Sequence, residues 1–136
     1  NAPGVDLPVC GFCRSKYGEY PEYHTSADNM SVISPEGLQG AYEVMQQVIM
    51  ALEYNKYYRI NCLCEPQLGK RGLYPTVSKK GIYTEVKKLT NFIAYADGKR
   101  DLLDISNKIG VPVYELIENI DKLKESGLLD EEICRN

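Results

Sequence analysis

The side chain best suited to chemistry in this sequence is the imidazole of His24, the single histidine of the chain. It stands in a polar, tyrosine-rich stretch that reads Tyr-His-Thr-Ser-Ala-Asp-Asn over residues 23–29. Neutral imidazole is a common zinc ligand, and a hydrogen bond to its second ring nitrogen usually fixes the ring. Asp28, Thr25 or a backbone carbonyl could accept that bond. On chemistry alone, however, a lone loop histidine is more often a surface or packing residue than a ligand.

Three tyrosines surround this histidine at a spacing of three residues, Tyr17, Tyr20 and Tyr23, and Arg14 precedes them. They could line a pocket in which Arg14 receives a substrate carboxylate, because a guanidinium pairs well with a planar anion. They could equally pack the loop onto the fold with their hydroxyls in water. Packing is the better interpretation of Tyr17, whereas both interpretations stay open for Tyr20, Tyr23 and Arg14.

The cysteines form a second group with potential chemistry: Cys10, Cys13, Cys62, Cys64 and Cys134. The first four could make a thiolate zinc site. Both pairs fall in predicted strands, however, where residues three apart face opposite ways, so we favour buried free cysteines. An odd number of cysteines without a signal segment favours a reducing cytoplasm over a disulfide framework.

The composition is that of a globular protein. Of 136 residues, 43% are hydrophobic and 26% are charged, enough for one domain or two small ones. No apolar run approaches the ~18 residues of a membrane span, and the start of the chain does not read as a signal peptide. The net charge of −3 disfavours nucleic-acid binding through bulk positive charge.

The first half of the chain predicts a strand, a loop and a helix. Residues 6–13 are an apolar run typical of a buried strand, and residues 14–33 read as an irregular loop. Ser34-Pro35-Glu36 is a strong helix start. Serine is a favoured N-cap, proline suits the first helical position, and glutamate is stabilised near the positive end of the helix dipole. Apolar residues at helical spacing extend this helix to about Tyr54.

The second half predicts a small helical domain. Residues 57–64 read as a strand and residues 65–78 as an extended connector. Three helical patterns follow, ending near Gly98, Gly110 and Gly127, and Leu128-Leu129 could begin a strand. We therefore predict the α/β (α+β) class, with an α/β segment over 1–80 and a winged-helix-like domain over 81–136.

Two motifs carry a resemblance to a known family. Residues 14–29 (RSKYGEYPEYHTSADN), with Ser-Pro-Glu-Gly-Leu over 34–38, closely resemble a bacterial aminopeptidase-like family. Residues 64–75 (CEPQLGKRGLYP) resemble the same family, which also has a winged-helix-like tail. Its members are related to the co-catalytic zinc aminopeptidases and are often found with polysaccharide-biosynthesis genes. The resemblance spans nearly all of this chain, but only about the last third of a family member.

The resemblance implies a role for His24. It matches the His-Thr-x-x-Asp motif that supplies the last ligand of a two-zinc centre, with Asp28 as an orienting partner. The other ligands and the general base lie in earlier sequence, so zinc is expected only in the full-length parent. The resemblance assigns no catalytic residue to this chain, which should be inactive in isolation. A small substrate with a peptide or other amide bond is implied, with Arg14, Tyr20 and Tyr23 as candidate contacts.

A second hypothesis treats the chain as an interaction module whose winged-helix tail binds nucleic acid or protein. Charge disfavours nucleic acid, because residues 85–136 hold 8 Lys and Arg against 11 Asp and Glu. The third predicted helix carries Glu115, Glu118, Asp121 and Glu125, which would repel phosphates. A packing or protein-interaction role is therefore favoured, and the sequence leaves a homo-oligomer open.

Overall fold

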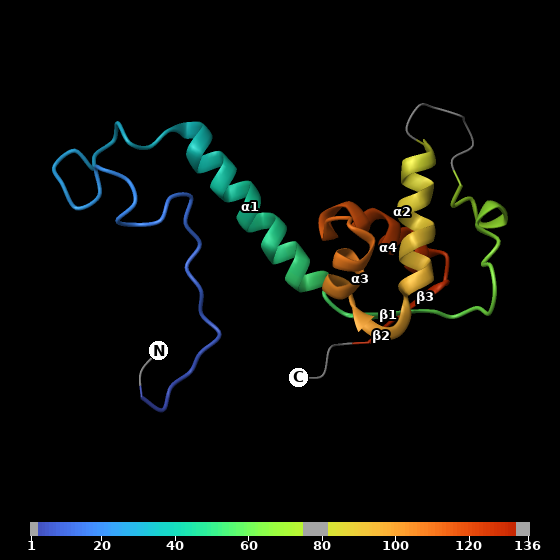
Figure 1. Ribbon diagram of the computed structural model, residues 1–136. Helices are drawn as coiled ribbons and strands as arrows, with labels where there is room; N and C mark the ends of the chain where they lie inside the picture. The colour runs from blue at the N-terminus through green and yellow to red at the C-terminus, as the bar shows by residue number, and fades with distance from the viewer. Residues whose placement is uncertain (1–2, 75–81, 133–136) are drawn as a thin grey trace. The chain divides into compact units, whose positions relative to one another are not determined.

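The computed structural model describes residues 3–74 and 82–132. The chain divides into two compact units, residues 1–45 and 46–136. Its elements, labelled in Figure 1, are α1 (Pro35–Tyr54), β1 (Tyr57–Ile60), the 3-10 helix η1 (Leu68–Arg71), α2 (Ile82–Tyr95), β2 (Asp97–Asp101), α3 (Leu102–Ile109), α4 (Val113–Glu125) and β3 (Leu129–Glu132). Helices combine with a small antiparallel sheet, which confirms the predicted α/β (α+β) class. None of the described helices is both long and apolar enough to cross a bilayer.

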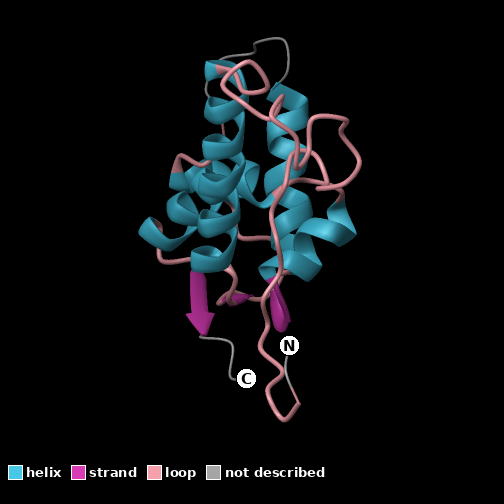
Figure 2. Ribbon diagram, turned by 90° about the vertical axis from the view of Figure 1, so that its left-hand side faces the viewer, coloured by secondary structure: helices cyan, strands magenta, loops and turns pink. Residues whose placement is uncertain are grey.

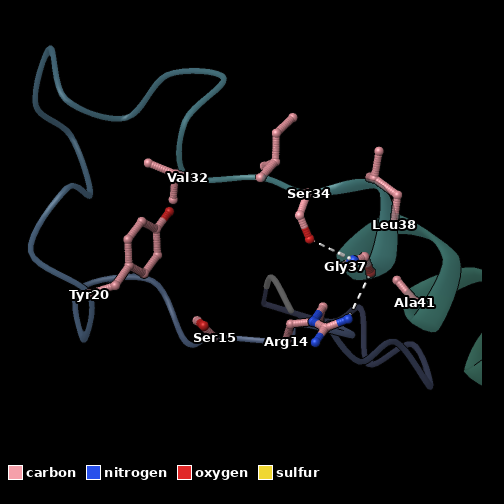
Figure 3. Close-up of a pocket in the computed structure, with 9 residues that line it drawn as sticks. Arg14, Ser15, Tyr20, Val32, Ser34, Gly37, Leu38 and Ala41 are labelled. Carbon is pink, nitrogen blue, oxygen red and sulfur yellow. Dashed lines mark hydrogen bonds between the residues drawn. The ribbon is translucent and has the colours of Figure 1, made fainter.

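Helix α1 begins where the sequence predicts. The Ser34 hydroxyl oxygen accepts a hydrogen bond from the Gly37 amide at 3.0 Å (Figure 3). This bond satisfies one of the amide groups that a first helical turn leaves without a partner. Pro35 opens the helix and Glu36 lies in its first turn, near the positive end of the helix dipole.

Residues 6–34 form loops and turns, drawn as the long pink segment of Figure 2. The strand predicted over residues 6–13 is therefore wrong for this chain. A strand needs a neighbouring strand to pair its amide and carbonyl groups, and no described strand pairs with this run. Between residues 3 and 45 no side chain is buried, so this unit has no core of its own.

The second unit holds a three-stranded antiparallel sheet in the order β2-β1-β3. Tyr57 pairs with Asp101 of β2 and with Glu132 of β3. The middle strand β1 thus comes from the segment before the helices. The units separate after residue 45, so the second unit includes the end of α1 as well as β1.

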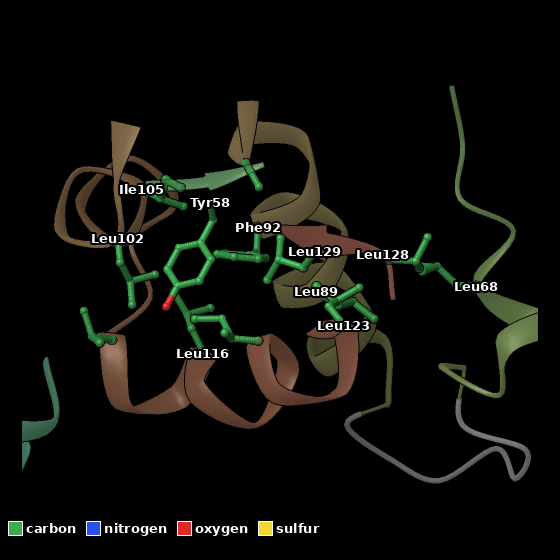
Figure 4. Close-up of a cluster of buried hydrophobic side chains, with 13 residues drawn as sticks. Tyr58, Leu68, Leu89, Phe92, Leu102, Ile105, Leu116, Leu123, Leu128 and Leu129 are labelled. Carbon is green, nitrogen blue, oxygen red and sulfur yellow. The ribbon is translucent and has the colours of Figure 1, made fainter. Parts of the chain in front are cut away.

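The core of the second unit is built around Tyr58, which is fully buried (Figure 4). Its ring meets the Phe92 ring edge to face, with centroids 5.9 Å apart, and its hydroxyl donates to the Tyr54 carbonyl at 2.9 Å. The remaining large, fully buried side chains come from η1, α3, α4 and the segment after α4: Leu68, Leu102, Ile105, Leu116, Ile120, Leu123 and Leu128.

Helix α3 is capped at both ends. The Asp101 carboxylate accepts from the Asp104 amide at 2.9 Å at the start of the helix. At its end, Gly110 takes a left-handed conformation with φ of 67°. This conformation suits glycine, which has no Cβ to clash. The two helices thus follow one another as expected for the predicted winged-helix-like domain.

A small ionic network joins β3 to its neighbours. The Glu131 carboxylate contacts Lys124 at 2.7 Å and Lys56 at 3.0 Å. The hydrogen bond from Lys124 and then that from Lys56 lower the pKa of Glu131, although partial burial opposes them. The network connects α4, β3 and the segment before β1.

Truncation of the core should cost far more than truncation of an exposed leucine. We expect Leu116→Ala, at a fully buried position, to lower the free energy of unfolding by about 2–5 kcal/mol through lost burial and a residual cavity. Leu63→Ala is the matched control, because that side chain is 95% exposed, and it should change stability by less than about 0.5 kcal/mol. Urea denaturation measures both. Equal losses for the two variants would contradict the core assignment.

The stability of the second unit should depend on pH through Glu131. A folded pKa below the ordinary value contributes stability that is present above that ordinary value and lost as pH falls through the folded pKa. The stability difference between wild type and Glu131→Gln should therefore shrink as pH falls from about 6 to about 3. Denaturant titrations at each pH measure it, with the exposed neighbour Glu132→Gln as control. A difference that stays constant with pH would refute the network's contribution.

Candidate functional site

The segment that carries His24 is a series of short turns closed by backbone hydrogen bonds. The amides of Tyr23, Thr25 and Asp28 donate to the carbonyls of Tyr20, Glu22 and Thr25 at 3.0–3.2 Å. The Thr25 hydroxyl donates to the Glu22 carbonyl at 2.7 Å and accepts from the Ala27 amide at 3.2 Å. Local bonding therefore defines the loop over residues 20–28 although nothing in it is buried.

His24 lies exposed within these turns in a left-handed conformation, with φ of 58°. Residues other than glycine occupy this region at a cost of about 1 kcal/mol or more, and such strain concentrates at functional positions. The imidazole stacks on the Tyr23 ring with centroids 4.1 Å apart and planes inclined by 19°. The loop thus presents one face of the imidazole to Tyr23.

The other candidate residues of the loop lie around this stack. Tyr20 meets Tyr23 edge to face at 5.6 Å between ring centroids, and Tyr17 lies 6.2 Å from Tyr23. The Tyr20 hydroxyl donates to the Asp28 carboxylate at 3.4 Å. Partial burial of Tyr20 and then the Asp28 carboxylate raise the pKa of the Tyr20 hydroxyl. Asp28 therefore contacts Tyr20 here, and its orienting role toward His24 stays a prediction.

Arg14 and Tyr20 line a cavity of about 410 Å³ beside the start of α1 (Figure 3). Arg14 donates from Nη1 to the Gly37 carbonyl at 2.8 Å. A Cβ on Gly40 would lie 3.0 Å from the same Nη1 atom, so the glycine leaves room for the guanidinium. Tyr23 and His24 are outside the lining of this cavity. The structure therefore splits the predicted site into an Arg14–Tyr20 cavity and a Tyr23–His24 stack that share the loop.

The ligand set for a metal is incomplete. Within residues 3–74 and 82–132, no three His, Cys, Asp or Glu side chains gather as ligands. Cys10, Cys13 and Cys64 are exposed free thiols and Cys62 is half-buried, so the expectation of buried cysteines is wrong for the first three. Cys134 lies outside the described residues. The described residues do not fit a complete zinc centre, and His24 can supply one ligand at most.

Sequence reasoning missed the structure of the segment after β1. The connector predicted over residues 65–78 contains η1, and Leu68 within it is 2% exposed. Cys64 and Gln67 have positive φ values of 63° and 47°. Arg71 ties the segment together by donating from Nε to the Pro66 carbonyl at 3.2 Å. Pro66 and the nearby glycines predicted only an irregular loop. The left-handed backbone at Cys64 and Gln67 is not indicated by any pattern in the sequence.

Two family models match the chain. Residues 56–131 match a family described as winged helix-turn-helix. Residues 1–55 match a family described as a domain of unknown function, DUF4910. The two matches meet just after α1, and the winged helix-turn-helix match contains β1, β2 and all of β3 except its last residue.

Similar proteins come from Clostridium acetobutylicum. One is named as a candidate polysaccharide biosynthesis protein with an aminopeptidase-like domain; it is 37% identical over 131 residues, which are 95% of this chain and 30% of that protein. A crystal structure of a candidate peptidase from the same organism is 34% identical, with a TM-score of 0.67 over 83% of this chain and 24% of that one. The chain therefore spans about a third or less of the proteins it matches. The resemblance to the C-terminal part of an aminopeptidase-like protein with a winged-helix domain is confirmed.

The Tyr20–Asp28 contact can be tested by titration. We expect Asp28→Asn to lower the Tyr20 pKa toward the ordinary tyrosine value, because the carboxylate disfavours a second negative charge beside it. The Tyr20 ring-carbon shift, followed by NMR in a pH titration, measures this. Glu53→Gln, on the exposed part of α1, is the control and should leave Tyr20 unchanged. An unaltered Tyr20 titration in Asp28→Asn would rule the contact out.

Proposed function

The chain belongs to the winged helix-turn-helix family through residues 56–131, and we propose that it is part of a zinc-dependent, aminopeptidase-like hydrolase. In this proposal residues 1–55 contribute one ligand, His24, to a centre of two zinc ions. The other ligands come from the remainder of a longer protein. The likeness to the Clostridium acetobutylicum protein with an aminopeptidase-like domain supports the hydrolase class.

The observation that carries the proposal is the presentation of His24. Its left-handed backbone and its stack on Tyr23 are held by a loop with no core behind it. A histidine needed only for packing would be buried, whereas this one is exposed in a conformation that costs free energy. An exposed, oriented imidazole with one face covered is suited to donate a ring nitrogen to a metal from outside.

The cavity beside the start of α1 suggests where a substrate lies. Arg14 uses Nη1 for the Gly37 carbonyl, and a guanidinium has five N–H donors in all. Its other donors can pair with a carboxylate, and the Tyr20 hydroxyl lines the same cavity. We propose a small substrate with an amide or peptide bond and an anionic group, with Tyr23 contributing through its stack with His24. Polysaccharide biosynthesis, in the relative's name, makes amide-bearing sugars one candidate class.

We propose a protein-contact or packing role for the winged helix, rather than nucleic-acid binding. Helix α4 presents acidic side chains, and two of them are already paired: Glu115 with Lys88 and Glu118 with Lys122. The Lys122 hydrogen bond lowers the pKa of Glu118. Binding of nucleic-acid phosphates to an acidic helix face would release few counterions, so little free energy would favour it.

The free thiols support a cytoplasmic location. Four described cysteines are unpaired, and three of these thiols are exposed. Exposed thiols persist in a reducing compartment.

The ligand assignment predicts the metal content of the longer protein. In that protein His24→Ala should reduce bound zinc and weaken zinc affinity by about 100-fold or more, since even outer-shell changes cost about 10–100-fold. Mass spectrometry of bound metal and competition with a chelator measure the two quantities. Tyr23→Phe, which keeps the stacked ring, is the matched control and should retain the metal. Two zinc ions held with unchanged affinity in His24→Ala would show that His24 is not a zinc ligand.

A further inference from the structure

The turn that carries His24 has an unusual residue at its third position. The Thr25 amide donates to the Glu22 carbonyl at 3.0 Å, which closes a turn of four residues. Its second residue, Tyr23, has a negative φ, whereas its third, His24, has a φ of 58°. Turns of this type normally have glycine or asparagine at the third position, because a Cβ disfavours positive φ. A histidine at this position therefore needs contacts that hold the turn in place.

The Thr25 side chain provides two such contacts. Its hydroxyl donates to the same Glu22 carbonyl at 2.7 Å and accepts from the Ala27 amide at 3.2 Å. The Glu22 carbonyl thus accepts two hydrogen bonds from Thr25, one from the amide and one from the hydroxyl. Hydrogen bonds between a hydroxyl and the nearby backbone stabilise turns. The Thr25 hydroxyl therefore joins the turn of His24 to the next turn of the loop.

Neither burial nor the Asp28 carboxylate accounts for this restraint. Residues 24–28 are all exposed, so apolar packing contributes little to the conformation of the turn. The Asp28 carboxylate accepts from the Tyr20 hydroxyl at 3.4 Å, and so contacts Tyr20 instead of the turn. The hydroxyl of Thr25 is therefore the side-chain group that restrains the backbone at His24.

We propose that Thr25 is a positioning residue for His24. Its hydroxyl holds the left-handed backbone of His24 and thereby the direction of the imidazole, and it acts on a bound metal only through that imidazole. The proposal rests on the function proposed above in one respect, that His24 is a zinc ligand in a longer protein. A ligand that is held in place before binding loses little conformational freedom, so this restraint raises the affinity for the metal.

Two substitutions of Thr25 separate the hydroxyl from the shape of the side chain. Valine has the same branched shape without the hydrogen bonds, and Thr25 is exposed, so Thr25→Val loses no buried packing. Thr25→Ser keeps the hydroxyl and should behave as wild type. Ser26→Ala is the matched control, because Ser26 contributes to the loop through its backbone carbonyl, which accepts from Asn29 Nδ2 at 3.4 Å.

The first measurement is NMR of the full 136-residue chain without metal, in which the single histidine makes the imidazole signals easy to assign. The Tyr23 ring should shift these signals upfield, because the two rings stack with centroids 4.1 Å apart. We expect Thr25→Val to lose most of this upfield shift, whereas Thr25→Ser and Ser26→Ala keep it. The Tm of the second unit should be the same in all three variants, because both positions lie in the first unit.

The second measurement is the zinc affinity of the longer protein, by competition with a chelator. We expect Thr25→Val to weaken zinc binding by about 10–100-fold, as removal of an orienting group does, and Thr25→Ser and Ser26→Ala to bind zinc as wild type does.

The two measurements can fail separately. If His24→Ala keeps its zinc affinity while Thr25→Val loses the upfield shift, the proposed function fails and the hold of Thr25 on His24 stands. An upfield shift that persists in Thr25→Val, or a loss that Thr25→Ser shares, would overturn the proposal. So would unchanged zinc affinity in Thr25→Val when His24→Ala loses zinc.

Discussion

The burial of Tyr58 is the interaction on which the second unit depends. Its ring is fully enclosed against Phe92 of α2, and its hydroxyl reaches back to the Tyr54 carbonyl at the end of α1. Tyr58 belongs to the middle strand β1, which pairs with β2 on one side and with β3 on the other. Burial of an aromatic ring of this size contributes a large apolar area, and the hydroxyl's hydrogen bond removes the cost of burying it. The helix-turn-helix therefore packs on a strand that precedes it in the chain.

The first unit, residues 1–45, is ordered by local hydrogen bonds and not by a buried core. Its order comes from bonds between near neighbours: the turns over residues 20–28, the serine cap of α1 and the Arg14–Gly37 contact. Such bonds set local geometry but bury little apolar surface, and net stability comes mainly from burial. A loop that holds His24 in a strained conformation is thus attached to a unit that has no core.

The sequence predicted the elements whose causes are local. The Ser34 cap predicted the start of α1, and Gly110 predicted the end of α3, because caps act within one turn of a helix. Strand β2 was not predicted: Asp-Gly-Lys-Arg-Asp reads as a turn, and these residues become a strand only by pairing with β1. The failure at residues 6–13 has the same origin, since a strand depends on a partner that the pattern cannot show. In the candidate site, the residue types were readable, whereas the left-handed backbone of His24 and the separation of Arg14 from it depend on chain geometry.

The central claim is that the second unit folds around its own core, whereas no described side chain between residues 3 and 45 is buried. Hydrogen exchange of the isolated chain, followed by mass spectrometry, tests this most directly. We expect slow exchange, set by global unfolding, for the amides of β1, α2 and α4, and exchange close to that of an unfolded peptide for residues 6–13. Protection of residues 6–13 equal to that of β1 would contradict this.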